Sequence, residues 1–341
     1  MTKKFYLLLG VVFIVSTSVC AFAQGKDPNA AEVLRRYKES LSYFQSISMK
    51  IDIEIRASES DRKYAPRKEI FVFRRDHDRT EWIGESLVLD KDGRVDPSIS
   101  FVLNEVMTGE YYGSVIGTIN EFPRLATIRK DYKERQKRKF DDPEHGGALL
   151  GKMFGNSHKG IAELLGEAAG LYLRDEQENI SGVSCYVLEA TTKHGKVTAW
   201  VAPEKGHNAL KWSIHKTSGD LFNKRPIYSD SCLAVFDSVE VQKVNDVFVT
   251  TGGCLTYTVN FADGRTNVSH HKYKVSEVDL NPDFEALGAF AFNLPDGTRV
   301  SVEEYPGVRY IWQSGKIVPD VDAPTFEEID KMVDEIKKEK K

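Results

Sequence analysis

Two short motifs in this 341-residue chain contain residue types that could do chemistry, and neither is complete. The run Gly146–Lys152 resembles a phosphate-binding loop, but Met153 stands where a hydroxyl group for magnesium is needed, and no apolar strand precedes the run. His270 and His271 are adjacent in a predicted strand, so their side chains point to opposite faces and cannot readily share a metal ion. The sequence contains no Gly-x-Ser-x-Gly elbow and no His-Glu-x-x-His motif. We therefore expect no catalytic residues, no metal site, no cofactor and no enzymatic activity.

The N-terminus has the three-part layout of a secretory signal peptide. Two lysines open it, Phe5–Val15 is apolar, and Ala21–Ala23 offers small residues before a cleavage site. The pattern predicts that residues 1–23 are removed and that the mature chain begins at Gln24, in the periplasm or another extracytoplasmic compartment. Two alternatives stay open: a membrane anchor, for which the apolar run is short, and a lipoprotein signal that ends at Cys20.

The charge balance of the mature chain argues against a nucleic-acid binder. The full chain has 47 basic and 51 acidic residues; without the two lysines of the signal peptide the net charge is −6. One basic segment, Arg124–Lys139, could contact an anionic lipid surface or an acidic partner, or could be solvated surface. No later stretch is apolar for about 18 residues, so we do not expect an integral membrane protein.

Three cysteines remain in the mature chain: Cys185, Cys232 and Cys254. Their odd number permits one disulfide with a free thiol in an oxidising compartment. Three buried thiols that pack as small apolar residues are the other interpretation. The sequence does not decide between these two arrangements.

Hydrophobic periodicity predicts many strands and few helices. Apolar residues recur at helical spacing over 30–45, and strict alternation follows over 47–55. Further alternating segments are 67–75, 79–89, 98–106, 110–117, 171–175, 183–192, 195–202, 208–216, 233–244, 247–259 and 267–279. Helical pieces are expected at 146–154 and 159–169, and a charged helix at 326–339.

These elements predict a single α+β domain. We expect one curved, unclosed antiparallel sheet, a half-barrel of about 11 or 12 strands, whose apolar face is covered by helices from 30–45 and 146–169. The expected boundaries place the half-barrel at 24–300, with a charged and helical insertion at about 118–170. A C-terminal extension follows at 301–341.

Four segments, in order, resemble the LolA-like family of periplasmic lipoprotein carriers in its broad sense. Residues 33–55 resemble the family's first helix and first strand. Glu69–Arg74 resembles a strand that ends in a functional arginine, and Trp82 follows at the expected interval. Residues 196–212 resemble a paired hairpin, and 290–298 resemble the closing Phe-x-Phe-x-x-Pro-x-Gly element.

The resemblance implies an unclosed sheet that binds acyl chains between its concave face and the helices. It also implies that Arg74 latches the helices to the sheet by donating hydrogen bonds to their backbone carbonyls. The chain departs from the family at Arg75, where the carriers usually have proline, and in its longer, more charged segment at 118–170. The resemblance therefore supports the family's fold for this chain more strongly than it supports the family's activity.

We expect non-enzymatic binding or carriage of a hydrophobic ligand, with a lipoprotein acyl chain or another lipid as the candidate. The aromatic residues that could line its cavity, or simply fill a core, are Phe71, Phe73, Trp82, Trp200 and Trp212. The alternative is a cell-envelope structural or protein-interaction module whose sheet is fully packed. The sequence identifies neither the ligand nor a partner protein nor an oligomeric state.

Overall fold

The computed structural model describes residues 28–320 and residue 331, apart from the internal stretches 60–61, 109–110, 120, 130–146, 152–158, 223–224, 304 and 306–307. The expected signal peptide therefore lies outside the described residues. So do most of the basic segment Arg124–Lys139 and all but one residue of the expected helix at 326–339. Among the described helices, none has the length and the apolar character needed to cross a membrane.

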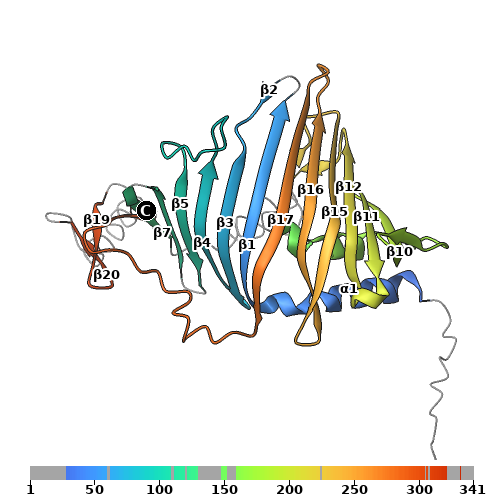
Figure 1. Cartoon of the computed structure of the whole chain (residues 1–341), viewed down its shortest axis with the longest axis horizontal. Coiled ribbons are helices and arrows are strands. Elements are labelled where there is room, and N and C mark those ends of the chain that lie inside the picture. Colours follow the sequence, from blue (N-terminus) through green and yellow to red (C-terminus); the bar gives the residue numbers. More distant parts are fainter. Residues whose placement is uncertain are drawn as a thin grey trace, which may run out of the picture.

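One large sheet of 18 strands dominates the described part of the chain (Figure 1). Its central strands are β3 (Arg67–Asp76), β1 (Ser46–Glu59), β17 (Thr266–Leu280), β16 (Val247–Asn260) and β15 (Ser231–Val244). Beyond β3 follow β4 (Arg79–Val88), β5 (Phe101–Met107), β6 (Tyr112–Thr118) and β7 (Glu121–Arg129). Beyond β15 follow β12 (Asn208–Thr217), β11 (Gly195–Ala202), β10 (Val183–Thr192), and then β8 (Leu171–Leu173) and β9 (Glu178–Ile180).

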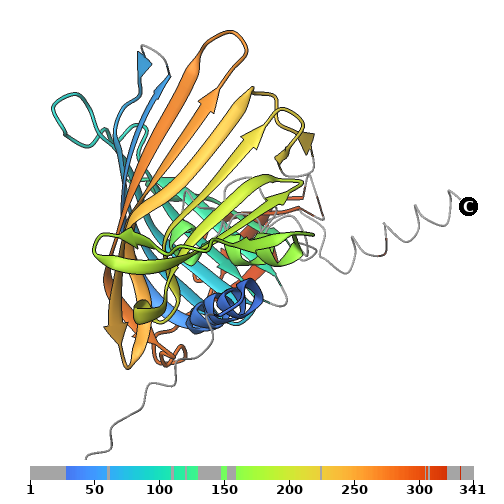
Figure 2. The ribbon, with the colours of Figure 1, turned by 90° about the vertical axis from the view of Figure 1, so that its right-hand side faces the viewer.

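Short strands extend this sheet beyond β7 and at the end of β1. The C-terminal part of the chain adds β18 (Arg299–Val302), β19 (Tyr310–Gln313) and β20 (Lys316–Pro319). β18 pairs with β7 in parallel, whereas the other pairings are antiparallel. β2 (Arg62–Lys63) pairs with the end of β1, and β13 (Leu221–Phe222) with β14 (Arg225–Pro226) forms a separate hairpin. Within the described residues no pairing joins β20 to β8 or β10, so the expected unclosed sheet is present (Figure 2).

The helical elements are few and short. They are α1 (Ala30–Ser40), η1 (Ser42–Gln45), η3 (Gly147–Leu150), α3 (Ile161–Glu167) and η4 (Pro203–Lys205). α1 begins where the Asn29 side chain accepts a hydrogen bond from the backbone N–H of Glu32 at 2.9 Å, which satisfies one of the N–H groups left unpaired at a helix start. The hydroxyl of Tyr43 then accepts a hydrogen bond from the backbone N–H of Thr250 at 3.0 Å, which fastens η1 to β16.

The expected α+β class with covering helices is wrong, because the described chain is predominantly strand. The segment 146–169 contributes only η3 and the seven-residue α3 to the described structure. Helices of 11 and 7 residues are about 16 Å and 10 Å long at 1.5 Å per residue. A sheet whose strands lie about 4.8 Å apart is several times wider. The helices accordingly make their main contacts with β8, β10, β11 and β12, on one side of the sheet.

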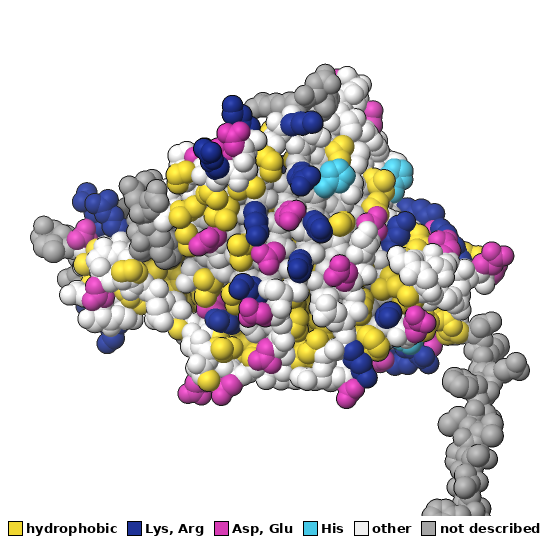
Figure 3. Space-filling view, viewed as in Figure 1, with side chains coloured by type: hydrophobic (Ala, Val, Ile, Leu, Met, Phe, Trp, Pro, Cys, Tyr) yellow, Lys and Arg dark blue, Asp and Glu magenta, His cyan; other side chains and the backbone are white. Residues whose placement is uncertain are grey.

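The two faces of the sheet carry different side chains. We call the face that contacts the helices the inner face; on β1 it presents Ile47, Met49, Ile51, Ile53 and Ile55, all buried. The outer face of the central strands carries charges of both signs (Figure 3). Cross-strand ion pairs there include Lys50 with Glu277 at 3.4 Å and Lys68 with Asp52 at 3.7 Å. The alternation expected for a half-buried strand is therefore confirmed on β1.

A C-terminal strap, residues 284–294, packs on the outer face of β5–β7. Phe290, Phe292 and Leu294 of the strap form a second buried cluster with outer-face side chains of these strands, Val106, Val115, Ala126 and Ile128. Beyond the strap, β18 pairs with β7, and Arg129 at the end of β7 forms an ion pair with Glu303. We expected helices on one apolar face as the cover of the sheet. At β5–β7 an extended segment covers apolar residues on the outer face instead.

We expect Gly113→Ala to loosen the strap. A Cβ atom at Gly113 would lie 2.9 Å from Cδ2 of Phe292, so the ring must shift and the free energy of unfolding should fall by about 1–3 kcal/mol. Urea denaturation measures the change. Gly170→Ala is the control, because nothing lies within 4 Å of a Cβ atom there. An unfolding midpoint that is the same for both variants would contradict the packing of the strap on β6.

Candidate ligand-binding site

Four of the five expected cavity residues lie on the inner face. Phe71, Phe73, Trp82 and Trp212 belong to the main core and are at most 3% exposed. Trp200 lies on the outer face, because its neighbour Ala199 occupies the inner position opposite Trp212. The indole N–H of Trp200 donates a hydrogen bond to Glu178 at 2.7 Å. Alternation along β11 therefore separates Trp200 from the other aromatic residues.

The inner-face aromatic rings pack against one another. The ring of Trp82 lies 5.5 Å from that of Phe71 and 4.7 Å from that of Phe73, between centroids. Trp212 stacks on Phe236 at 5.5 Å, and the void lined by these two rings and by α1 has a volume of about 10 Å³. That volume is too small for a ligand, so the core around Trp212 is closely packed.

Arg74 has a different partner from the one expected. It lies on the outer face, and its guanidinium group donates a hydrogen bond to Glu81 of β4 at 2.7 Å. The other carboxylate oxygen of Glu81 accepts the backbone N–H of Phe290 at 3.3 Å. Burial raises the pKa of Glu81, and the charge of Arg74 opposes that rise. Arg74 and Glu81 thus connect β3 and β4 to the strap rather than to the helices.

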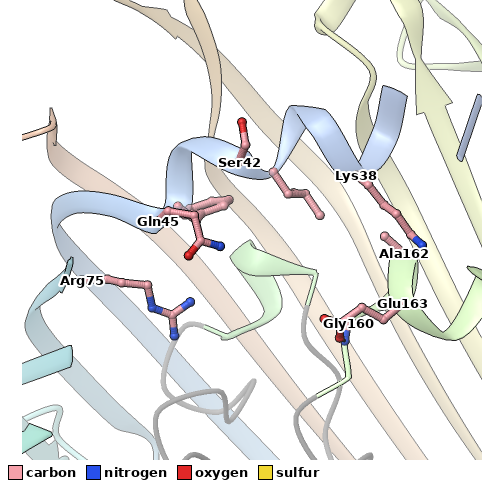
Figure 4. A pocket seen from close by; sticks show the side chains of 9 residues that line it. Lys38, Ser42, Gln45, Arg75, Gly160, Ala162 and Glu163 are labelled. Carbon is pink, nitrogen blue, oxygen red and sulfur yellow. The ribbon is translucent and has the colours of Figure 1, made fainter. Parts of the chain in front are cut away.

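Arg75, the next residue, lies on the inner face and points toward the helices (Figure 4). It follows Phe71 and Phe73 in the alternation of β3, and its guanidinium carbon lies 5.5 Å from the ring centre of Phe73. Arg75 lines a cavity of about 390 Å³ between β3, α1, η1 and α3, which we call the seam pocket. Its lining residues are Lys38, Leu41, Ser42, Phe44, Gln45, Arg75, Gly160, Ala162 and Glu163.

The seam pocket combines an apolar wall with polar groups. Leu41, Phe44 and Ala162 supply the apolar wall, and Phe44 is continuous with the main core. Glu163 is engaged by its own helix, since its carboxylate accepts the backbone N–H of Gly160 at 2.6 Å. Such a mixed lining and a volume of a few hundred cubic ångströms are typical of small-molecule sites.

A second cavity of about 340 Å³ lies along the α1–α3 contact. Lys38 lines both this cavity and the seam pocket. Its ammonium group lies across Gly166 of α3, where a Cβ atom would approach Nζ to 2.5 Å. The contact between the two helices thus combines a glycine and a flexible lysine side chain with Leu34 and Leu165, which are buried in the main core.

The inner face of β6 and β7 is partly exposed, at Ile116 and Leu125. Ile116 lies opposite Leu103 of the main core and opposite Leu125 of β7. Ile116 and Leu125 are each 48% exposed, whereas the outer-face residues Val115 and Ala126 on the same strands are fully buried under the strap. The apolar surface of the core thus continues to solvent at this margin.

Buried polar groups also lie elsewhere on the described structure. Glu105, buried on the inner face, accepts hydrogen bonds from the hydroxyls of Tyr112 at 2.5 Å and Ser114 at 3.2 Å. Burial raises the pKa of Tyr112. The three cysteines are free thiols, and the described residues contain no group of three or more potential metal ligands. Cys185 and Cys232 are buried, as expected for thiols that pack as apolar residues, whereas Cys254 is half-buried.

No protein-family model matches this chain. No curated protein matches it either. Among solved structures, it is similar to a DUF1329 family protein from Desulfovibrio piger, with 11% identity, coverage of 74% of this chain and 92% of that one, and a TM-score of 0.35. It is also similar to lipovitellin, from a study of lipid–protein interactions, with 7% identity, coverage of 70% of this chain and a TM-score of 0.25. The match spans about a quarter of the lipovitellin chain, 26%. These likenesses establish neither a family nor an activity, and membership of the LolA-like family stays a prediction.

The sequence analysis missed Arg75 and the Ile116–Leu125 pair. Alternation could have found Arg75, because it shares its parity with Phe71 and Phe73, whereas Arg74 does not. For Ile116 and Leu125 the sequence carried no usable signal. Their exposure depends on where the strap and the helices lie, and β7 runs through a segment that had not been predicted as a strand.

We expect Arg74→Leu to destabilise the strap and to spare α3. The variant leaves the carboxylate of Glu81 buried without its cation, a change that costs about 3–5 kcal/mol when a buried pair is broken. Hydrogen exchange should become faster in 288–294. Lys50→Leu is the control, because its outer-face ion pair with Glu277 is exposed and is worth less than about 1 kcal/mol. Faster exchange in 161–167 with an unchanged strap would instead support a latch on the helices.

Proposed function

We propose that this protein binds a hydrophobic ligand on the inner face of its sheet, without enzymatic activity. The observation that carries the proposal is the half-exposed pair Ile116 and Leu125 on the inner face of β6 and β7. The chain buries the outer face of the same strands with its own strap. Apolar surface left open beside a covered face is typical of a surface that binds an apolar partner.

The open margin is continuous with the main core. Leu103 lies between Ile116 and Gly84 across the strands, and Gly84 faces Phe71. Phe73 lies next on that face and precedes Arg75 of the seam pocket. α1 and α3 contact mainly the other half of the sheet, β8 and β10–β12. An apolar chain on β6 and β7 could therefore extend along this row of inner-face residues toward the seam pocket, by displacing the contacts between them.

We also propose that the protein works outside the cytoplasm and that its ligand is a lipid. The signal-like N-terminus supports work outside the cytoplasm, and the ordered resemblance to LolA-like proteins makes a lipoprotein acyl chain or another lipid the first candidate ligand. An unclosed sheet suits this task because it can part from a small cover and expose apolar surface. An anionic surface contact through Arg124–Lys139 would be compatible with collection of a ligand from a membrane.

The close packing around Trp212 favours a second candidate, a packed module for protein interaction in the cell envelope. The void between α1 and the rings of Trp212 and Phe236 has a volume of only about 10 Å³, so that part of the sheet has no room for a ligand. A module of this kind would bury its exposed residues against another protein and would not bind small apolar molecules. Binding of an apolar fluorophore separates the two candidates.

We expect Ile116→Lys to weaken saturable binding of an uncharged apolar fluorophore by about tenfold. The substitution places a charge on the open inner face, and tenfold corresponds to about 1.4 kcal/mol, close to the transfer free energy of part of an isoleucine side chain. Fluorescence titration, with competition by a fatty alcohol, measures the affinity.

The matched control is Leu233→Lys. Leu233 is also a partly exposed apolar strand residue, 38% exposed, but it lies on the outer face because its neighbours Cys232 and Ala234 face inward. We expect its affinity to equal that of the unmodified protein. Equal losses in both variants, or no saturable binding by the unmodified protein, would contradict the proposal.

A further inference from the structure

Two buried polar atoms near α1 have no hydrogen-bond partner among the described residues. They are Nε1 of Trp212, a residue that is 2% exposed, and Oδ1 of Asn208, which is 1% exposed. A buried donor or acceptor that stays unpaired loses its hydrogen bonds to water without compensation. Such atoms in native proteins are generally satisfied by the chain or by an ordered water molecule.

The orientation of the Asn208 amide is fixed by its nitrogen atom. Nδ2 donates hydrogen bonds to the backbone carbonyl of Lys205 at 2.9 Å and to that of Phe248 at 3.1 Å. A flipped amide would place its oxygen against these two carbonyl oxygens, which accept hydrogen bonds but cannot donate them. The unpaired atom of Asn208 is therefore an acceptor, whereas the unpaired atom of Trp212 is a donor.

Both side chains line the void between α1 and the rings of Trp212 and Phe236. Tyr37 of α1 lines it as well, and burial raises the pKa of its hydroxyl. The volume of about 10 Å³ is too small for an organic ligand but corresponds to one water molecule. The wall of this void thus offers a donor, an acceptor and a hydroxyl that can act as either.

We propose that a single water molecule binds in this void and joins α1 to β12. The water accepts the indole N–H of Trp212, donates to Oδ1 of Asn208, and forms a third hydrogen bond with the hydroxyl of Tyr37. About three hydrogen bonds are typical of a buried water molecule. Tyr37 belongs to α1, whereas Asn208 and Trp212 belong to β12, so the water connects the helix to the sheet. The inference is independent of the proposed function.

Apolar side chains close the site on its other sides. Leu41 follows α1, Ala148 and Leu149 belong to η3, and Phe236 belongs to β15. Ala148, Leu149 and Phe236 are each at most 2% exposed. A water molecule behind this wall leaves only when one of these elements moves, so its exchange with bulk water is slow.

The test is a water–protein NOE measurement by NMR on the unmodified full chain, deuterated and labelled with ¹⁵N. The indole N–H of Trp212 should show a cross-peak with water whose NOE and ROE have opposite signs. This pattern marks a water molecule that stays bound for longer than the protein takes to tumble. Trp212→Phe assigns the resonance, because it removes one indole signal. The internal control is the indole N–H of Trp200, which donates to Glu178 at 2.7 Å and should show no such cross-peak.

A second variant tests a different source of the same signal. The hydroxyl proton of Tyr37 exchanges with water and could relay magnetisation to the indole N–H of Trp212. Tyr37→Phe removes this proton and leaves the water its hydrogen bonds to Trp212 and Asn208, so the cross-peak should persist.

Two outcomes would overturn the proposal. A Trp212 indole N–H without a water cross-peak in the unmodified chain would mean that the void is dry. A cross-peak that disappears in Tyr37→Phe would mean that the signal came from the hydroxyl proton. Neither result would affect the proposal of ligand binding on the inner face of β6 and β7.

Discussion

The structure depends on one constraint: each long strand of an unclosed sheet presents two faces, and apolar side chains on either face must be covered. On β1 the division is clean, with buried Met49 and Ile51 facing inward and exposed Lys50 facing outward. On β6 both faces are apolar, with Val115 on one side and Ile116 on the other. Among the described residues, the strap covers the outer face of this strand, and Ile116 on the inner face is half-exposed. The inner face at β6 and β7 is consequently partly open, and the function we propose follows from this exposed apolar surface.

The two covers of the sheet differ in how they are held. The strap is fixed by a buried carboxylate: Glu81 binds both Arg74 and the backbone of Phe290. Arg79 adds a contact over the Phe290 ring at 4.7 Å. α3, in contrast, is seven residues long and meets α1 across a glycine and a lysine stem. Ile161, Ala162, Leu164 and Leu165 of α3 are buried in the main core, so α3 is held by apolar packing and the strap also by a buried ion pair.

Much of the strand pattern could be predicted, because alternation is a local property of the sequence. The strand predicted at 47–55 is β1, and the paired hairpin around Trp200 and Trp212 is β11 and β12. Neighbouring residues were harder to assign. The resemblance pointed to Arg74, but one step along a strand exchanges the two faces, and Arg75 is the residue that reaches the helices. The covers could not be predicted either. The strap binds β4–β7 through contacts that are distant in sequence, and a short non-periodic segment such as 284–294 carries no signal for the surface it will bury.

The central claim is that an apolar chain binds on the inner face, and photo-crosslinking with an uncharged diazirine-bearing fatty alcohol tests it most directly. The account predicts saturable labelling of inner-face strand residues, above all on β6 and β7, with additional labelling of η1 or α3 at the seam pocket. An excess of unlabelled fatty alcohol should abolish it. Saturable labelling confined to the outer face of β15–β17, or labelling that rises linearly with probe concentration, would contradict the account.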